Sequence, residues 1–116
     1  METVKYTDNE IKFGIKKISF KLKIRTLISL DKSVVVLLEV PYTDNETLNN
    51  IHAFNLLGDK IWTVQAVSEK YPNLNKYLPF ENLVYSDKML RASDFMGRRF
   101  LINPKDGKLL NMETVK

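Results

Sequence analysis

His52 is the only histidine in the 116-residue chain, and the chain contains no cysteine. Thiolate catalysis, disulfides and cysteine-ligated metals are therefore excluded. His52 lies between Ile51 and Ala53 in a segment that reads as a strand, and no serine or cysteine nucleophile motif lies nearby. In nucleophilic catalysis, a histidine base takes the proton from a serine hydroxyl or a cysteine thiol. The sequence therefore favours an ordinary strand residue over a catalytic base.

Asp44 and Glu46 lie in one polar loop, where two carboxylates could chelate a hard cation. Their spacing matches no calcium-binding loop, and Asp and Asn are also the residues that favour turns. Asp8 and Glu10 repeat the motif within a second Tyr-Thr-Asp-Asn-Glu segment. The turn interpretation is favoured, and we predict no metal ligand.

Other catalytic signatures are missing from the sequence. Asp94-Phe95-Met96-Gly97 has the Asp-Phe of the kinase magnesium motif, but its glycine comes one residue late and the other kinase motifs are absent. A hairpin turn is predicted there instead. The four glycines are dispersed, so no phosphate-binding loop exists. We predict no catalytic residue, no cofactor and no enzymatic activity; an enzyme would need a site assembled from His52, Asp44 and Asp94.

Lys21, Lys23 and Arg25 are the first candidate binding residues. Residues 11–25 include six basic side chains and no acidic one. Alternate residues of a strand share a face and lie roughly 6.6 Å apart, similar to successive phosphates. Two interpretations stay open: the three cations bind a polyanion, or they protect a strand edge from unwanted pairing. Edge protection is favoured, because no aromatic side chain for base stacking shares the lysine face.

Tyr71, Tyr77 and Phe80 are the second candidate. They lie in a predicted loop that also holds Pro72 and Pro79. Aromatic residues and prolines in irregular structure suit a surface that binds a protein partner. In the alternative, which is slightly favoured, the loop caps the end of a sheet with its own side chains.

Short strands must position these residues. Apolar residues alternate over 11–15 and over 18–24, and the change of phase predicts a bulge or turn at Lys16-Lys17. The apolar run 34–40 predicts a strand buried on both faces, against which we expect Trp62 to pack. Further strands are predicted at 51–55, 61–65, 83–85, 89–93, 98–102 and 108–111, with at most one short helix. The predicted fold class is all-β, a small antiparallel sheet or sandwich built of β-hairpins.

Residues 51–64 and 99–112 share one pattern of a strand, an Asn, a turn with a glycine, a Lys and an apolar strand. Gly58-Asp59-Lys60-Ile61-Trp62 matches a G-x-x-x-W turn, and Gly107-Lys108-Leu109-Leu110 matches it without the tryptophan. In these turns the segment 34–112 resembles β-propeller blade repeats of the pyrroloquinoline-quinone type. The resemblance implies two blade-like units, too few to close a ring. No cofactor residue carries over, because the cofactor sites of such propellers need a complete ring.

The length predicts a single domain over 1–116. Within it we expect a basic β-ribbon at 11–30, a first blade-like unit at 34–66, a loop at 67–81 and a second blade-like unit at 82–112. Open sheet edges in such units would allow a homo-oligomer.

The composition, 44% hydrophobic and 28% charged, is typical of a soluble globular domain. No apolar run is long enough to span a membrane, and no apolar stretch follows the N-terminus as in a signal peptide. We therefore expect a cytoplasmic protein without a membrane partner, of bacterial or phage origin. The expected function is a non-enzymatic binding protein that engages a macromolecular partner, in the manner of immunity or anti-defence proteins. The alternative is a nucleic-acid or anionic-ligand binder that uses the basic ribbon.

Overall fold

A computed structural model describes residues 4–114 of the chain. Within that range the fold is all-β with one short helix, as predicted. The strands are β1 (Val4–Tyr6), β2 (Glu10–Phe13), β3 (Lys16–Ser19), β4 (Ile24–Ser29), β5 (Ser33–Leu38), β6 (Ile51–Asn55), β7 (Lys60–Thr63), β8 (Phe80–Ser86), β9 (Met89–Asp94), β10 (Arg98–Ile102) and β11 (Leu109–Thr114). The helix α1 (Val67–Lys70) is a single turn.

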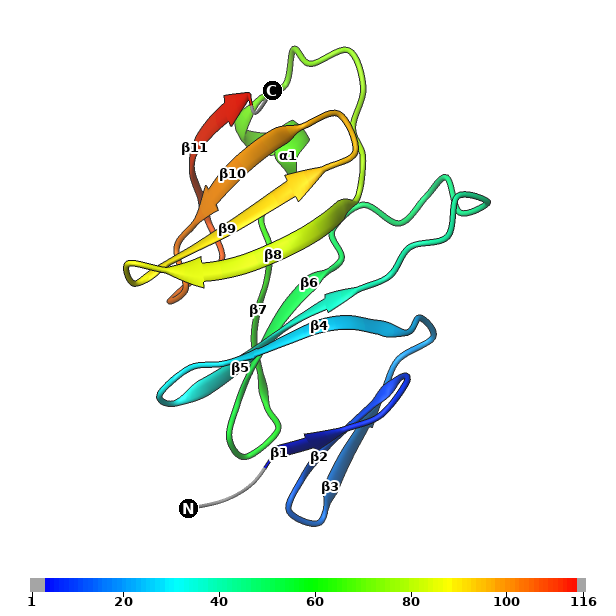
Figure 1. Cartoon of the computed structure of the whole chain (residues 1–116), viewed down its shortest axis with the longest axis vertical. Helices are drawn as coiled ribbons and strands as arrows, with labels where there is room; N and C mark the ends of the chain where they lie inside the picture. The colour runs from blue at the N-terminus through cyan, green and yellow to red at the C-terminus, as the bar shows by residue number, and fades with distance from the viewer. Residues whose placement is uncertain (1–3, 115–116) are drawn as a thin grey trace.

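The strands form three antiparallel sheets, each of which follows the order of the chain. An N-terminal sheet contains β1, β2 and β3; a central sheet contains β4 to β7; and a C-terminal sheet contains β8 to β11. The three sheets are stacked along the long axis of the molecule, with the central sheet between the other two (Figure 1). The predicted ribbon segment 11–30 therefore contributes strands to two sheets, because β4 pairs with β5.

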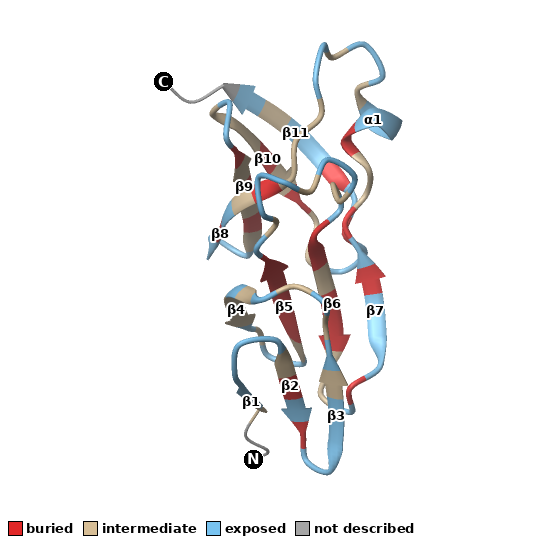
Figure 2. Cartoon of the chain, turned by 90° about the vertical axis from the view of Figure 1, so that its right-hand side faces the viewer, coloured by how far each residue is buried: buried red, intermediate tan, exposed pale blue. Residues whose placement is uncertain are grey.

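The central strand β5 explains how the stack is held together. Val34 to Leu38 are all buried, and Figure 2 shows this strand in the buried colour. Val35 and Leu37 belong to a core shared with the C-terminal sheet, which includes Phe100. The alternate residues, represented by Val36, belong to a second core shared with the N-terminal sheet. A strand with a core on each face needs apolar residues at every position, as the sequence pattern predicts.

The N-terminal sheet has the predicted division into an apolar and a cationic face, but its turn is elsewhere. Ile11 and Phe13 are buried, whereas Lys12 between them is exposed. The hairpin turn lies at Gly14-Ile15, where Gly14 has a φ of +63°, and not at Lys16-Lys17, which begin β3. Ile15 is consequently fully exposed. The phase change arises because two turn residues separate the paired strands.

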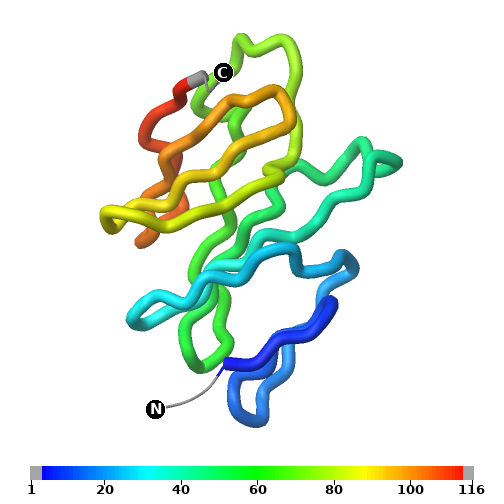
Figure 3. Tube along the Cα trace, viewed as in Figure 1, coloured from blue at the N-terminus to red at the C-terminus, as the bar shows by residue number. Residues whose placement is uncertain are grey.

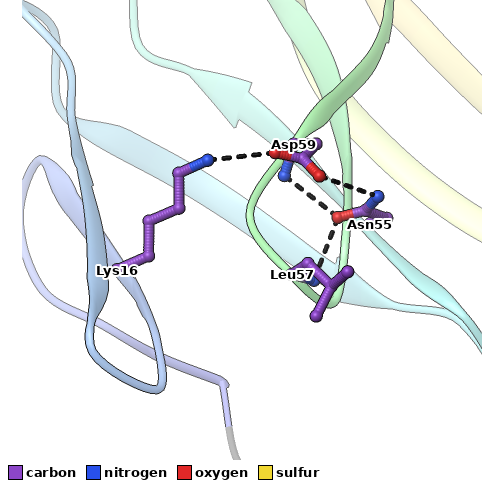
Figure 4. Close-up of polar contacts among 4 residues, drawn as sticks. All are labelled: Lys16, Asn55, Leu57 and Asp59. Carbon is purple, nitrogen blue, oxygen red and sulfur yellow. Dashed lines mark hydrogen bonds and ion pairs between the residues drawn. The ribbon is translucent and has the colours of Figure 1, made fainter.

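Two contacts tie distant hairpins together. The Lys16 ammonium of β3 lies 3.0 Å from the Asp59 carboxylate in the β6–β7 turn, and the same turn is shaped by the Asn55 side chain (Figure 4). The indole N–H of Trp62 donates a 3.0 Å hydrogen bond to the carbonyl of Pro104, in the β10–β11 turn. Trp62 is buried in the same core as Val35 and Leu37, as expected.

The blade-like pattern corresponds to a similar hydrogen-bonded turn in two hairpins, β6–β7 and β10–β11. Asn55 accepts hydrogen bonds at its side-chain oxygen from the backbone N–H groups of Leu57 and Asp59. Asn103 in the second turn likewise accepts one from Lys105. The two sheets that contain these turns, the central sheet and the C-terminal sheet, are both four-stranded meanders. The kinship with propeller blades stays a prediction, as does pairing between copies at the edge strands.

Candidate binding groove

An open groove of about 410 Å³ lies between two long loops and the β9–β10 turn. One wall is the loop from β5 to β6, with Pro41, Tyr42 and Leu48; the other is the loop from α1 to β8, with Tyr77 and further residues through Pro79. Glu81 of β8 and Phe95 of the β9–β10 turn complete the lining. Figure 3 follows both loops along the trace of the chain.

Two large aromatic side chains stand exposed at this groove. Tyr42 is 85% exposed and Phe95 is 70% exposed. Their rings meet edge to face, with centroids 6.5 Å apart and planes at 83°. Most aromatic side chains of this size bury a large area in a core or an interface. Binding of a partner at the groove would therefore be favoured by the burial of these two exposed rings.

The first wall is fixed by a carboxylate that is fully engaged within its own loop. Asp44 accepts hydrogen bonds from the backbone N–H groups of Glu46 and Thr47, both at 2.9 Å, and from the Thr47 hydroxyl at 2.7 Å. The Thr47 bonds hold the pKa of Asp44 below its ordinary value. This is the turn chemistry that the sequence favours over cation binding.

The second wall is fixed by a buried ion pair. Arg98 Nε donates a 2.7 Å hydrogen bond to Asp94, and both side chains are largely shielded from solvent. Asp94 also accepts from the backbone N–H groups of Met96 and Arg98, which closes the predicted hairpin turn. Another guanidinium nitrogen of Arg98 donates to the carbonyl of Lys76 and holds the loop against the hairpin.

Asn50 joins the two loops from the inside. Its side chain is completely buried and donates 2.8 Å hydrogen bonds to the carbonyls of Leu38 and Phe80, and its oxygen accepts one from the Phe80 N–H. These bonds connect the end of β5 in the central sheet with the start of β8 in the C-terminal sheet. The sequence analysis did not single out Asn50, and no local pattern distinguishes it from its exposed neighbour Asn49.

The predicted aromatic candidates divide between surface and core. Tyr77 lines the groove, and its hydroxyl donates a 2.7 Å hydrogen bond to the carbonyl of Tyr71. Tyr71 is half-buried with its ring 6.2 Å from that of Phe100. Phe80 is 2% exposed and packs edge to face on Phe100. The interpretation of Phe80 as a contact residue is therefore wrong: it caps the sheet from within, because the chain enters β8 through the core.

Lys21, Lys23 and Arg25 are all exposed, but they do not lie on one continuous strand. Lys21 and Lys23 fall in the connection between β3 and β4, and Arg25 is the extra residue of a bulge in the pairing of β4 with β5. The guanidinium of Arg25 lies 3.7 Å from the Glu39 carboxylate. The three cations are accessible, and the structure does not bring them to the groove.

The contacts of His52 support its structural interpretation. Nδ1 lies 2.9 Å from the Thr63 hydroxyl, and the ring stacks on Phe20 with centroids 6.3 Å apart. Burial, and secondarily the charge of Lys60, lower its pKa from 6.5 to about 4. An imidazole in this setting stays neutral near pH 7.

Over residues 4–114, no group of three or more His, Asp or Glu side chains is placed so that it could hold a metal ion. In the same range, no helix is long and apolar enough to cross a membrane.

The comparison with known families assigns nearly the whole chain to one family. Residues 1–114 match the model of DUF7957, a domain of unknown function. The chain belongs to this family. No curated protein matches it.

Proposed function

We propose that this DUF7957 domain is a small protein-binding module that engages one macromolecular partner through the aromatic groove. The observation that carries the proposal is the exposed pair Tyr42 and Phe95 at the opening of a groove of about 410 Å³. Aromatic side chains are enriched at protein interfaces and supply much of the binding energy there. A partner side chain that enters the groove would cover both rings at once.

The groove walls favour a binding role over chemistry. The charged side chains that line the groove are Asp44, Lys76 and Glu81. Asp44 is engaged by hydrogen bonds within its own loop, and the ion pair of Asp94 with Arg98 supports the second wall. The same contacts hold the walls in place before a partner arrives, which lowers the entropy cost of association. We propose that the domain acts by occupancy and blocks its partner, as immunity and anti-defence proteins do, and that it needs no cofactor for this.

The proposal is tested by crosslinking at the groove. A photoreactive phenylalanine analogue is placed at position 42 of the full chain, which is then irradiated in an extract of the native host. The same analogue at Leu57, which is 71% exposed in the β6–β7 turn, is the matched control. We expect a protein captured from position 42 only. Capture from both positions, or from Leu57 alone, would contradict the proposal.

The captured partner is then purified and its affinity measured by calorimetry. We expect Tyr42→Ala and Phe95→Ala each to raise the dissociation constant by about 30-fold, the effect of a typical interface hot spot of about 2 kcal/mol. Leu57→Ala should leave it unchanged. Circular dichroism checks that the variants are folded. Equal affinity of all three variants would show that the partner binds elsewhere.

A further inference from the structure

The outward face of the N-terminal sheet carries three lysines in register across all three strands. Lys5 of β1 pairs directly with Lys12 of β2, and Lys12 pairs directly with Lys17 of β3. All three are exposed, and the sheet forms one end of the stack (Figure 1), and none of its residues lines the groove. Neighbouring strands lie about 4.8 Å apart, so the row spans about 10 Å.

Like charges directly opposite one another on a sheet are unfavourable. Within residues 4–114, one acidic residue, Glu10, shares this face: its carboxylate lies 3.6 Å from the Lys17 ammonium and accepts a 3.2 Å hydrogen bond from the Ser19 hydroxyl. Among the described residues, neither Lys5 nor Lys12 has an ion-pair partner. The charge of Lys12 therefore repels those of Lys5 and Lys17, and an acidic residue at position 12 would replace this repulsion by attraction.

Edge protection does not account for this row. Lysines guard edges when they lie on the outermost strands, as Lys5 and Lys17 do. Lys12, however, lies on β2, whose two neighbours already satisfy its backbone. Its charge therefore requires another explanation, and a polyanionic ligand supplies one, because it would turn the repulsion into attraction.

The composition of the face indicates which polyanion fits. Its described side chains are Lys5, Glu10, Lys12, Lys17 and Ser19, and none is aromatic. Binding of single-stranded nucleic acid depends on bases stacked on aromatic rings, whereas duplex binding needs only cations at the phosphates. We propose that this face binds the phosphate backbone of double-stranded nucleic acid without regard to sequence. The site is separate from the aromatic groove and does not depend on the function proposed for it.

The test measures binding of a labelled DNA duplex by fluorescence anisotropy at several salt concentrations. Three phosphate contacts predict a slope of about −2.7 in a plot of log affinity against log salt, or about a 40-fold loss between 50 and 200 mM. Replacing Lys5, Lys12 and Lys17 together by Gln should abolish that slope. The matched control replaces Lys32, Lys70 and Lys105, exposed lysines of other elements, and removes the same net charge. We expect the control to retain the wild-type slope.

A second variant separates binding from folding. Lys12→Glu replaces two repulsive pairs by two attractive ones, so its melting temperature should rise while duplex binding is lost. The proposal is overturned if both triple variants lose binding equally, since net charge alone would then explain it. It is also overturned if the wild type binds vesicles containing phosphatidylserine but not the duplex, or if Lys12→Glu binds the duplex as the wild type does.

Discussion

The buried side chain of Asn50 offers a test of how the central and C-terminal sheets are joined. Its amide makes three hydrogen bonds to backbone groups of Leu38 and Phe80, and no part of it is exposed. In Asn50→Ala the Phe80 N–H and two carbonyls lose these partners in the interior. A buried polar group left without a partner costs about 1–3 kcal/mol. Since some of these groups can find other partners, we expect a loss of about 3–5 kcal/mol in the free energy of unfolding.

Urea unfolding followed by the fluorescence of Trp62 measures this loss. A domain of this size is stable by about 5–15 kcal/mol, so the variant should remain folded and measurable. Asn49→Ala is the matched control, because the neighbouring side chain is exposed and its removal should cost less than about 0.5 kcal/mol. If the two variants unfold at the same urea concentration, the role assigned to Asn50 is wrong.

Asn50→Asp keeps the shape of the side chain and changes only the donor. Its second oxygen would face the carbonyls of Leu38 and Phe80, which offer no proton. The ionised form is therefore both buried and opposed by dipoles, which raises the pKa of the new carboxyl in the folded state. A raised folded pKa means that the destabilisation should diminish as the pH falls. Asn50→Ala should show no such recovery relative to the wild type.

Two further predictions concern the central sheet. Trp62→Ala should lower the free energy of unfolding by about 3–5 kcal/mol, because the indole fills the core and packs so closely on Gly107 that an added Cβ there would clash with the ring. Blue-shifted emission of the wild type should report the same burial, and red, fully quenchable emission would contradict it. The pKa of His52 is about 4 in the folded chain and 6.5 when unfolded, so stability should be complete above pH 6.5 and decline towards pH 4 as the unfolded chain binds the proton. The decline in the free energy of unfolding is at most about 3 kcal/mol, and it is smaller to the extent that solvent reaches the ring. In His52→Gln, the urea midpoints measured at pH 7 and at pH 4.5 should lie closer together than in the wild type. The carboxylates of Asp44 and Asp59, whose pKa values are lowered from 3.8, affect stability only at lower pH.

Local patterns predicted much of the fold. The run 34–40 and the strand 51–55 were recognisable because their burial is encoded in consecutive residues, and β6 has the predicted bounds Ile51–Asn55. The predicted position of the turn in the N-terminal hairpin was wrong, because the phase change at Lys16-Lys17 indicates that a turn is present but not which residues form it. Gly14, which adopts a positive φ, was the signal that could have placed it.

The candidate sites were harder to predict, since each is made by segments far apart in the chain. Tyr42 and Phe95 are separated by 53 positions and meet only because the loops around them converge. Phe80 belongs to the same aromatic run as Tyr77, yet one lies in the core and the other at the groove. Sequence composition cannot separate them, because the difference depends on where the chain enters β8.

The two proposed surfaces impose different requirements on the fold. The groove depends on Asn50, Asp94 and Arg98, which hold its walls, so variants of those residues should weaken both stability and partner binding. The lysine row behaves in the opposite way, because relieving its repulsion should stabilise the sheet while removing the site. A selection for stability alone would therefore preserve the groove walls and eliminate the positive charge at Lys12. The presence of that unpaired charge on the middle strand of the sheet, among the residues that the structure describes, is the physical reason to look for a ligand there.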